Sequence, residues 1–209
     1  MSAAYETYQI NINRVKNFIS LYDNATSSQG RGRKTTLTTD ILRAGVVFLH
    51  STLEEYLRTV ILKRKMDLLM SDVNNFNNVL SNVNLCGENS GKSTARKYAL
   101  SEFWNYKEKT ISQIVTDSLS DKVGYMTFNE YSQIIASLKD INISLSKNFN
   151  IDGIIDNYII RRHKIVHEAD KNSSRGRGYF QSSSINSPTL TAWITAVDTM
   201  ITDIESQLD

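Results

Sequence analysis

The sequence lacks the features that disulfide-bonded, zinc-cysteine and membrane-spanning proteins require. Cys86 is the only cysteine in the chain, so no disulfide can form within it and no zinc site can be built from cysteines. No stretch reaches the roughly 18 apolar residues of a membrane helix, and the first residues lack a basic start followed by an apolar run. We therefore expect a cytoplasmic protein with no membrane segment.

The chain also lacks a strong excess of charge of either sign. Its 24 Lys and Arg residues face 22 Asp and Glu residues, which gives a formal net charge of +2, and 40% of its residues are hydrophobic. This composition is typical of a globular protein and excludes a highly charged disordered chain. Contacts with nucleic acid would have to come from local clusters of Arg and Lys. The length predicts a single domain over residues 1–209.

Hydrophobic residues recur at three- and four-residue steps, which is the period of an α-helix. Such stripes run through residues 8–22, 42–60, 131–141, 154–166 and 190–208. The two-residue alternation of β-strands flanked by hairpin turns is missing. Pro188, the only proline, stands just before the last stripe, where the first turn of a helix tolerates it. We expect an all-α bundle of about five or more helices, with short helices between residues 90 and 120.

The segment GENSGKST, residues 87–94, resembles a nucleotide-binding phosphate loop without fitting it. That loop needs the pattern G-x-x-x-x-G-K-[ST], so that its backbone amides curl around a phosphate. Here the two glycines stand one residue too close, and no predicted strand leads into the segment. We interpret it as a loop before a helix.

The segment RRHKIVHEAD, residues 161–170, gathers basic side chains at the end of a helix that Asp152 can cap. On a helical projection, Arg162 falls inside the apolar arc of residues 154–166. An arginine on an apolar face is costly unless it meets an anion or lines a wet cleft. Because arginine binds phosphate bidentately and keeps its charge, a phosphate is the anion that we expect.

His163 and His167 lie four residues apart on one side of this helix, and Asp156 shares that side. Imidazoles take and give protons near neutral pH, and a carboxylate can orient one of them. Together with Arg162, these side chains favour cleavage of a phosphodiester. Without such a function, the segment would be a solvated basic edge with Arg162 paired to a carboxylate elsewhere.

The two histidines also have the spacing of paired zinc ligands on a helix. The glutamate of the H-E-x-x-H motif is absent, because Lys164 follows His163. The remaining ligands would have to come from Glu168, Asp170 or Asp156. We therefore expect no metal and no cofactor.

The spacing of Arg162 and His167 resembles the R-x(4–6)-H motif of the HEPN superfamily (higher eukaryotes and prokaryotes nucleotide-binding domains). The segment RAGVVFLHSTLEEYLR, residues 43–58, is similar to the long early helix of its bacterial members. The resemblance implies a HEPN-like helical bundle and a dimeric, metal-independent endoribonuclease. Arg161 offers the same motif with one more residue of spacing, and the place of Arg162 on the apolar arc favours Arg162.

The resemblance also implies roles for the residues of the motif. Arg162 would stabilise charge on the phosphate, His167 would act as general acid or base, and His163 would take a position that is often asparagine. The 2′-hydroxyl of RNA would attack the adjacent phosphate and leave a 2′,3′-cyclic phosphate and a 5′-hydroxyl. Arg161 and Lys164 are predicted to bind the substrate.

Two further features have open interpretations. His50 and Glu54, four residues apart on the early helix, either support the motif helix or form an ordinary surface pair. The arginine-containing loops 30–34 and 174–178 either close over RNA or keep the chain soluble.

Taken with these patterns, the resemblance implies an endoribonuclease that acts on RNA as a homodimer in toxin–antitoxin or anti-phage defence. An antitoxin or another regulatory protein would be a further partner. The alternative is a HEPN-like module that binds RNA, nucleotide or a partner protein and does not cut.

Overall fold

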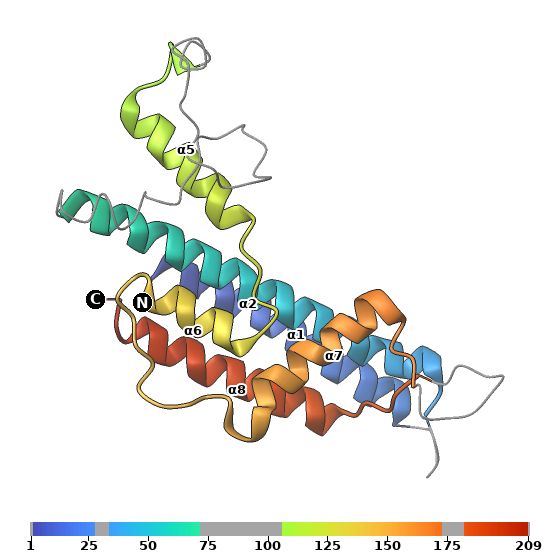
Figure 1. Ribbon diagram of the computed structural model, residues 1–209. Coiled ribbons are helices and arrows are strands. Elements are labelled where there is room, and N and C mark those ends of the chain that lie inside the picture. Colours follow the sequence, from blue (N-terminus) through green and yellow to red (C-terminus); the bar gives the residue numbers. More distant parts are fainter. Residues whose placement is uncertain (1, 28–33, 72–105, 173–181, 209) are drawn as a thin grey trace. The chain divides into compact units, whose positions relative to one another are not determined.

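The computed structural model describes residues 2–27, 34–71, 106–172 and 182–208 (Figure 1). The helices in this part of the chain are α1 (Ala3–Thr26), α2 (Thr36–Ser71), α5 (Ile111–Gly124), α6 (Tyr131–Lys139), the short 3-10 helix η2 (Ile151–Gly153), α7 (Ile154–Glu168) and α8 (Ser187–Glu205). Over the same residues the only β-pairing is an isolated bridge between Lys171 and Ser182. The predicted all-α fold is confirmed. None of the helices described is long and apolar enough to cross a membrane.

The chain forms two compact units. The larger contains residues Met1–Leu57 and Thr127–Asp209, and the smaller contains residues Arg58–Met126. The boundary falls inside α2, so this helix begins in one unit and ends in the other. A single domain over residues 1–209 stays a prediction.

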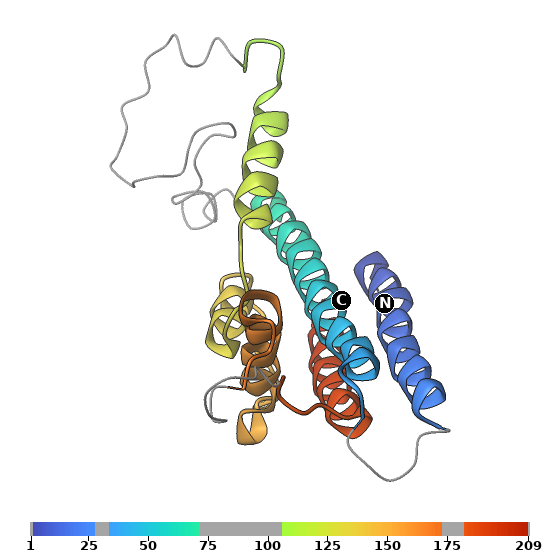
Figure 2. The same cartoon turned by 90° about the vertical axis from the view of Figure 1, so that its right-hand side faces the viewer.

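Three long elements, α1, the first part of α2 and α8, carry most of the core of the larger unit (Figure 2). Their predicted apolar stripes are buried: Tyr8, Ile12 and Val15 on α1, Leu42, Val46, Leu49 and Leu53 on α2, and Leu190, Val197, Ile201 and Ile204 on α8. Helix α8 also packs against both α1 and α7. Pro188 is in the first turn of α8, as predicted.

Gly45 lets α2 come close to its neighbours. A Cβ atom at this position would lie 2.8 Å from Leu190 Cδ2 and 3.2 Å from Phe18 Cβ. Glycine costs helical stability in a helix interior. The cost is offset here because a larger residue would push α1 and α8 away from α2.

The smaller unit contains the end of α2 and α5. Leu69 of α2 and Leu119 of α5 form its buried hydrophobic cluster. Thr110 begins α5 with a reciprocal capping box to Gln113. Helix α5 confirms part of the prediction of short helices between residues 90 and 120, while residues 72–105, including GENSGKST, lie outside the described residues.

Three tyrosines are fully buried in the larger unit. Tyr8 donates to Asp198 (3.1 Å), Tyr56 donates to Glu205 (2.9 Å), and Tyr158 lies 3.0 Å from His50 Nδ1. Burial raises the pKa of all three phenols above the ordinary value of 10.0, because the phenolate would lose its solvation.

We expect the free energy of unfolding to fall as the pH rises above about 10, the ordinary tyrosine pKa. The three phenols ionise in the unfolded chain but stay protonated in the folded chain, so their contribution is complete below that pH and is lost above it. Each phenol adds up to about 1.4 kcal/mol per pH unit. Urea denaturation at a series of alkaline pH values measures this slope. Titration of all ten tyrosines without unfolding would contradict it.

Candidate functional site

Helix α7 carries most of the predicted site residues and begins at a sharp turn. Asp152 (φ 54°) and Gly153 (φ 69°) adopt the left-handed conformation just before it. Asn150 Oδ1 accepts hydrogen bonds from the backbone N–H groups of Ile155 (2.8 Å) and Asp156 (3.1 Å). The prediction that Asp152 caps α7 is therefore wrong, because the left-handed turn brings the side chain of Asn150 over the first N–H groups of the helix.

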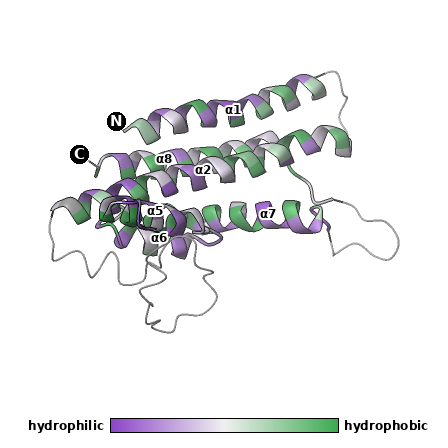
Figure 3. Ribbon diagram, turned by 90° about the horizontal axis from the view of Figure 1, so that it is seen from above, coloured by the Kyte–Doolittle hydropathy of each residue, from purple (hydrophilic) through white to green (hydrophobic). Residues whose placement is uncertain are grey.

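Only the N-terminal half of α7 is buried. Ile155, Tyr158 and Ile159 face the core, whereas Ile160 and Val166 are 52% and 48% exposed. Hydrophobic and hydrophilic colours alternate along the helix (Figure 3). The predicted apolar arc is confirmed in the first half, and Val166 is an exception because the helix leaves the core toward its end.

Asp170 is fully buried between two arginines. Its Oδ2 accepts from Arg43 Nε of α2 (2.7 Å) and from Arg161 Nη2 of α7 (2.8 Å). Its Oδ1 lies 2.8 Å from Arg161 Nε, an ion-pair contact without hydrogen-bond alignment. The same two guanidiniums donate to the backbone oxygen of Ser183. This cluster ties the end of α7 to α2 and to the chain leading into α8.

The backbone at the end of α7 aims Asp170 inward. Ala169 (φ 50°) and Asp170 (φ 57°) are both left-handed, and the Asp170 N–H donates to the Lys164 oxygen (2.9 Å). Non-glycine residues adopt this conformation at a cost. The two ion pairs of Asp170 offset that cost.

The substrate contact predicted for Arg161 stays a prediction. Its Nε and Nη2 are already engaged by Asp170 and by the backbone oxygens of Ser183 and Ser184. Arg161 therefore has a structural role that the sequence did not indicate.

His50 and Glu54 support α7 from α2. His50 is 1% exposed, its Nδ1 lies 3.0 Å from the Tyr158 hydroxyl, and its Nε2 lies 3.2 Å from Glu54 Oε1. The interpretation of a surface pair is therefore wrong. The reason is that this side of α2 faces α7 and not solvent.

Arg162 differs from Arg161, although the two are adjacent. Its side chain is partly buried, and its Nε is buried with no hydrogen-bond acceptor. In the described part of the chain, its guanidinium makes no hydrogen bond or ion pair. Arg162 thus has donors that are open to a ligand, as an anion-binding residue needs.

His163 and His167 are exposed and in contact. Their ring centroids are 4.5 Å apart, with the ring planes inclined at 41°. Lys164, between them in sequence, is exposed as well. The exposed end of α7 thus presents two imidazoles and an ammonium group to solvent.

Asp156 has a different place from the one expected. Its Oδ1 accepts from the Tyr131 N–H (2.9 Å) and its Oδ2 accepts from Asn150 Nδ2 (2.6 Å). His163 lies seven residues later, about 10 Å along a helix that rises 1.5 Å per residue. The prediction that Asp156 orients a histidine is wrong, because both oxygens serve the start of α6 and the turn before α7.

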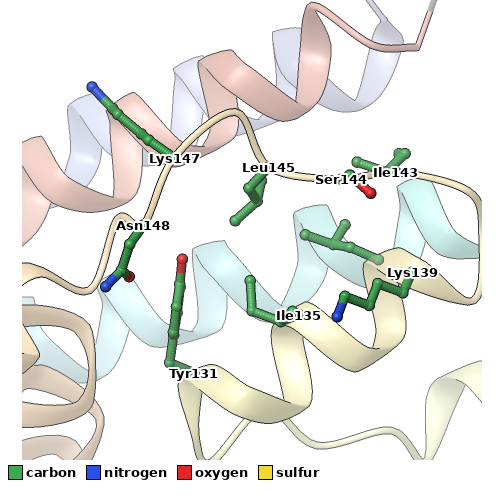
Figure 4. Close-up of a pocket in the computed structure, with 9 residues that line it drawn as sticks. Tyr131, Ile135, Lys139, Ile143, Ser144, Leu145, Lys147 and Asn148 are labelled. Carbon is green, nitrogen blue, oxygen red and sulfur yellow. The ribbon is translucent and has the colours of Figure 1, made fainter.

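Within the described ranges, no group of three or more His, Cys, Asp or Glu side chains is placed to hold a metal ion. A pocket of about 310 Å³ lies between α6 and the loop that follows it, with Tyr131, Ile135 and Leu145 in its wall (Figure 4). Of the two arginine-containing loops, residues 174–178 lie outside the described residues, and only Lys34 of residues 30–34 is described.

The sequence analysis missed Arg43 and the inward role of Asp170. Arg43, His50 and Glu54 stand seven and four residues apart, so they form one row along α2 beside its apolar stripe. A row of ionisable side chains at the edge of an apolar stripe could have indicated a polar contact with another helix. Nothing in the sequence pattern identified Asp170 as its partner.

We expect Asp170→Asn to lower the free energy of unfolding by about 3–5 kcal/mol, because the buried Arg43 and the partly buried Arg161 lose the carboxylate that they share. Asp40→Asn is the matched control. Asp40 also pairs with Arg43 (2.9 Å), but its side chain is 57% exposed, so its loss should cost under about 1 kcal/mol. Urea denaturation of both variants measures the difference. Equal losses would show that burial of Asp170 is not the cause.

One of the comparisons with known proteins gives a match to this chain. A family model described as RiboL-PSP-HEPN matches residues 9–209. Neither a curated protein nor a solved structure matches the chain. Because the family model spans nearly the whole sequence, the chain belongs to the RiboL-PSP-HEPN family of the HEPN superfamily.

Proposed function

We propose that this protein is a metal-independent endoribonuclease of the HEPN type. Membership of the HEPN superfamily supports ribonuclease activity, since members of the type that the motif resembles are typically endoribonucleases. The observation that carries the proposal is the state of Arg162, whose buried Nε has no acceptor while two exposed histidines follow it on the same helix. An arginine that has no anion bound to it, and that lies near proton-transfer groups, is suited to the cleavage of a phosphodiester.

The proposed reaction needs only groups that α7 and the RNA supply. The 2′-hydroxyl loses its proton to an imidazole and its oxygen forms a bond with the adjacent phosphorus. The bond to the 5′-oxygen breaks, and an imidazolium gives a proton to that oxygen. Arg162 stabilises the charge that builds on the phosphoryl oxygens, and His167 exchanges a proton, with His163 beside it.

The proposed assembly is a homodimer in which the exposed ends of two α7 helices meet. Ile160 and Val166 are large apolar side chains that are about half exposed beside the motif. Burial of such side chains against a second copy would stabilise the dimer. A cellular role as a toxin or anti-phage effector, with an antitoxin or another regulatory partner, belongs to the same proposal.

We expect the purified chain to cut structured RNA in excess chelator, leaving 2′,3′-cyclic phosphate and 5′-hydroxyl ends. Arg162→Ala and His167→Ala should each lower the rate by at least about 100-fold, the order of losing one charge-stabilising group or one proton-transfer group. Arg14→Ala is the matched control, an exposed arginine on α1. Gel electrophoresis and end-group analysis of the products give the measurement.

Three outcomes of this assay point away from the proposal. Tight RNA binding without cleavage favours a non-catalytic HEPN module. Activity that the chelator abolishes favours a metal-dependent hydrolase. Cleavage of DNA at a similar rate excludes attack by a 2′-hydroxyl, since DNA has none.

We expect the Ile160→Ser/Val166→Ser double variant to raise the dimer Kd by about 10-fold or more, because four half-exposed apolar side chains leave the proposed interface. Cleavage should fall with dimer occupancy and return at high protein concentration. Light scattering and activity over a dilution series measure both. Leu37, which is 80% exposed on α2, gives the matched control as Leu37→Ser. A monomeric wild-type chain that cuts RNA would refute the dimer.

A further inference from the structure

His163 and His167 place two imidazole rings side by side at the exposed end of α7. Their ring centroids are 4.5 Å apart, and both side chains are exposed. Among the residues that the structure describes, neither ring forms a hydrogen bond or an ion pair. A neutral imidazole carries one nitrogen lone pair. The two lone pairs are therefore open to a ligand from solvent.

The distance between the two rings fits a single small ion. Zn²⁺ binds an imidazole nitrogen at about 2.0–2.1 Å, so it lies about 3.2 Å from the ring centroid. Two centroids 4.5 Å apart then subtend an angle of about 90° at the ion, near the tetrahedral angle of about 109° that zinc prefers. Because both side chains are exposed, each ring can turn about its Cβ–Cγ bond to aim a nitrogen at the shared position.

Helix α7 holds the two histidines at this spacing. The helix runs to Glu168, and residues four apart on a helix lie on one face. Asp170 fixes the turn that follows, because its N–H donates to the Lys164 oxygen (2.9 Å) and its carboxylate is buried. The backbone under the pair is thus ordered before any ion binds, which lowers the entropic cost of binding.

The charges around the pair also admit a cation. His167 is in the last turn of α7, where the helix dipole places a partial negative charge. Lys164 and Glu168 are both exposed next to the pair, and their charges are opposite. The flexible stem of Lys164 lets its ammonium group move away from a bound ion. The positive charge of Lys164 therefore does not close the site.

Two protein ligands make a weaker site than a resident metal needs. Structural zinc sites have four protein ligands and catalytic zinc sites have three. The described stretches of the chain place no third His, Cys, Asp or Glu side chain with the pair. A bound ion would keep water in its other positions and would exchange with solvent. Nitrogen ligands favour Zn²⁺ over Mg²⁺ and Ca²⁺, which prefer oxygen.

We propose that His163 and His167 bind Zn²⁺ reversibly and that the bound ion inhibits RNA cleavage. A nitrogen that holds the ion has no lone pair to take a proton and no proton to give, so the pair cannot transfer protons while the ion is bound. The inhibition rests on the proposed function, whereas the binding of the ion does not. A reaction that needs no metal would thus be stopped by one.

Calorimetric titration of the purified chain with ZnCl₂ tests the site. His163→Gln and His167→Gln should each raise the Kd for Zn²⁺ by about 10-fold or more, because each variant keeps only one of the two protein ligands. Lys164→Gln is the matched control, an exposed change between them that should not raise the Kd. An equal Kd in the wild type and both histidine variants overturns the site. A Kd that rises only in Cys86→Ser places the ion on the thiol and also overturns it.

RNA cleavage tests the inhibition. At a free Zn²⁺ concentration of about ten times the Kd, the rate of the wild type should fall about 10-fold, because about nine-tenths of the chains then hold the ion. Excess chelator should restore the rate, and the same concentration of MgCl₂ should not lower it. An unchanged or faster rate with the site filled overturns the inhibition.

The two proposals fail in different ways. If the wild type binds Zn²⁺ through both histidines but cuts no RNA, the nuclease function is lost and the metal site stands. If the wild type cuts RNA in chelator and the Kd for Zn²⁺ is the same in all variants, the metal site is lost and the nuclease function stands.

Discussion

One buried carboxylate, Asp170, holds the end of α7 in place. Taking a carboxylate and two guanidiniums out of water costs several kcal/mol per ion, which close pairing has to offset. Asp170 achieves this only because two left-handed residues turn it inward, toward Arg43 and Arg161. The cluster therefore ties the backbone turn after α7 to a specific position on α2.

Polar contacts between α2 and α7 fix the rotation of α7 as well as its position. Apolar contacts through Ile155 and Ile159 alone would tolerate small rotations of a helix about its axis. Hydrogen bonds have directions, and here two of them act about one turn apart, one between Tyr158 and His50 and one from Arg161 to Asp170. With the rotation fixed, Arg162 follows Arg161 on α7 with its side chain partly buried.

The sequence predicted the helices well because their period depends only on which residues are apolar. It predicted the site less well, because the roles of its polar residues depend on distant partners. Arg43 and Asp170 are 127 residues apart, and their contact exists only once the turn after α7 has formed. The cap of α7 shows the same limit, since both Asn150 and Asp152 are good capping residues and the backbone turn decides between them.

The short distance between the two histidine rings gives a chemical reason why the proposed cleavage would need a second copy of the chain. In-line displacement at phosphorus places the attacking and leaving oxygens on opposite sides, so a base and an acid must flank the phosphate. His163 and His167 have ring centroids 4.5 Å apart, which leaves no room for a phosphate between them. They can serve one side of the reaction together. The other side would then take its proton-transfer group from the α7 helix of a second chain, and this is the chemical argument for the proposed dimer.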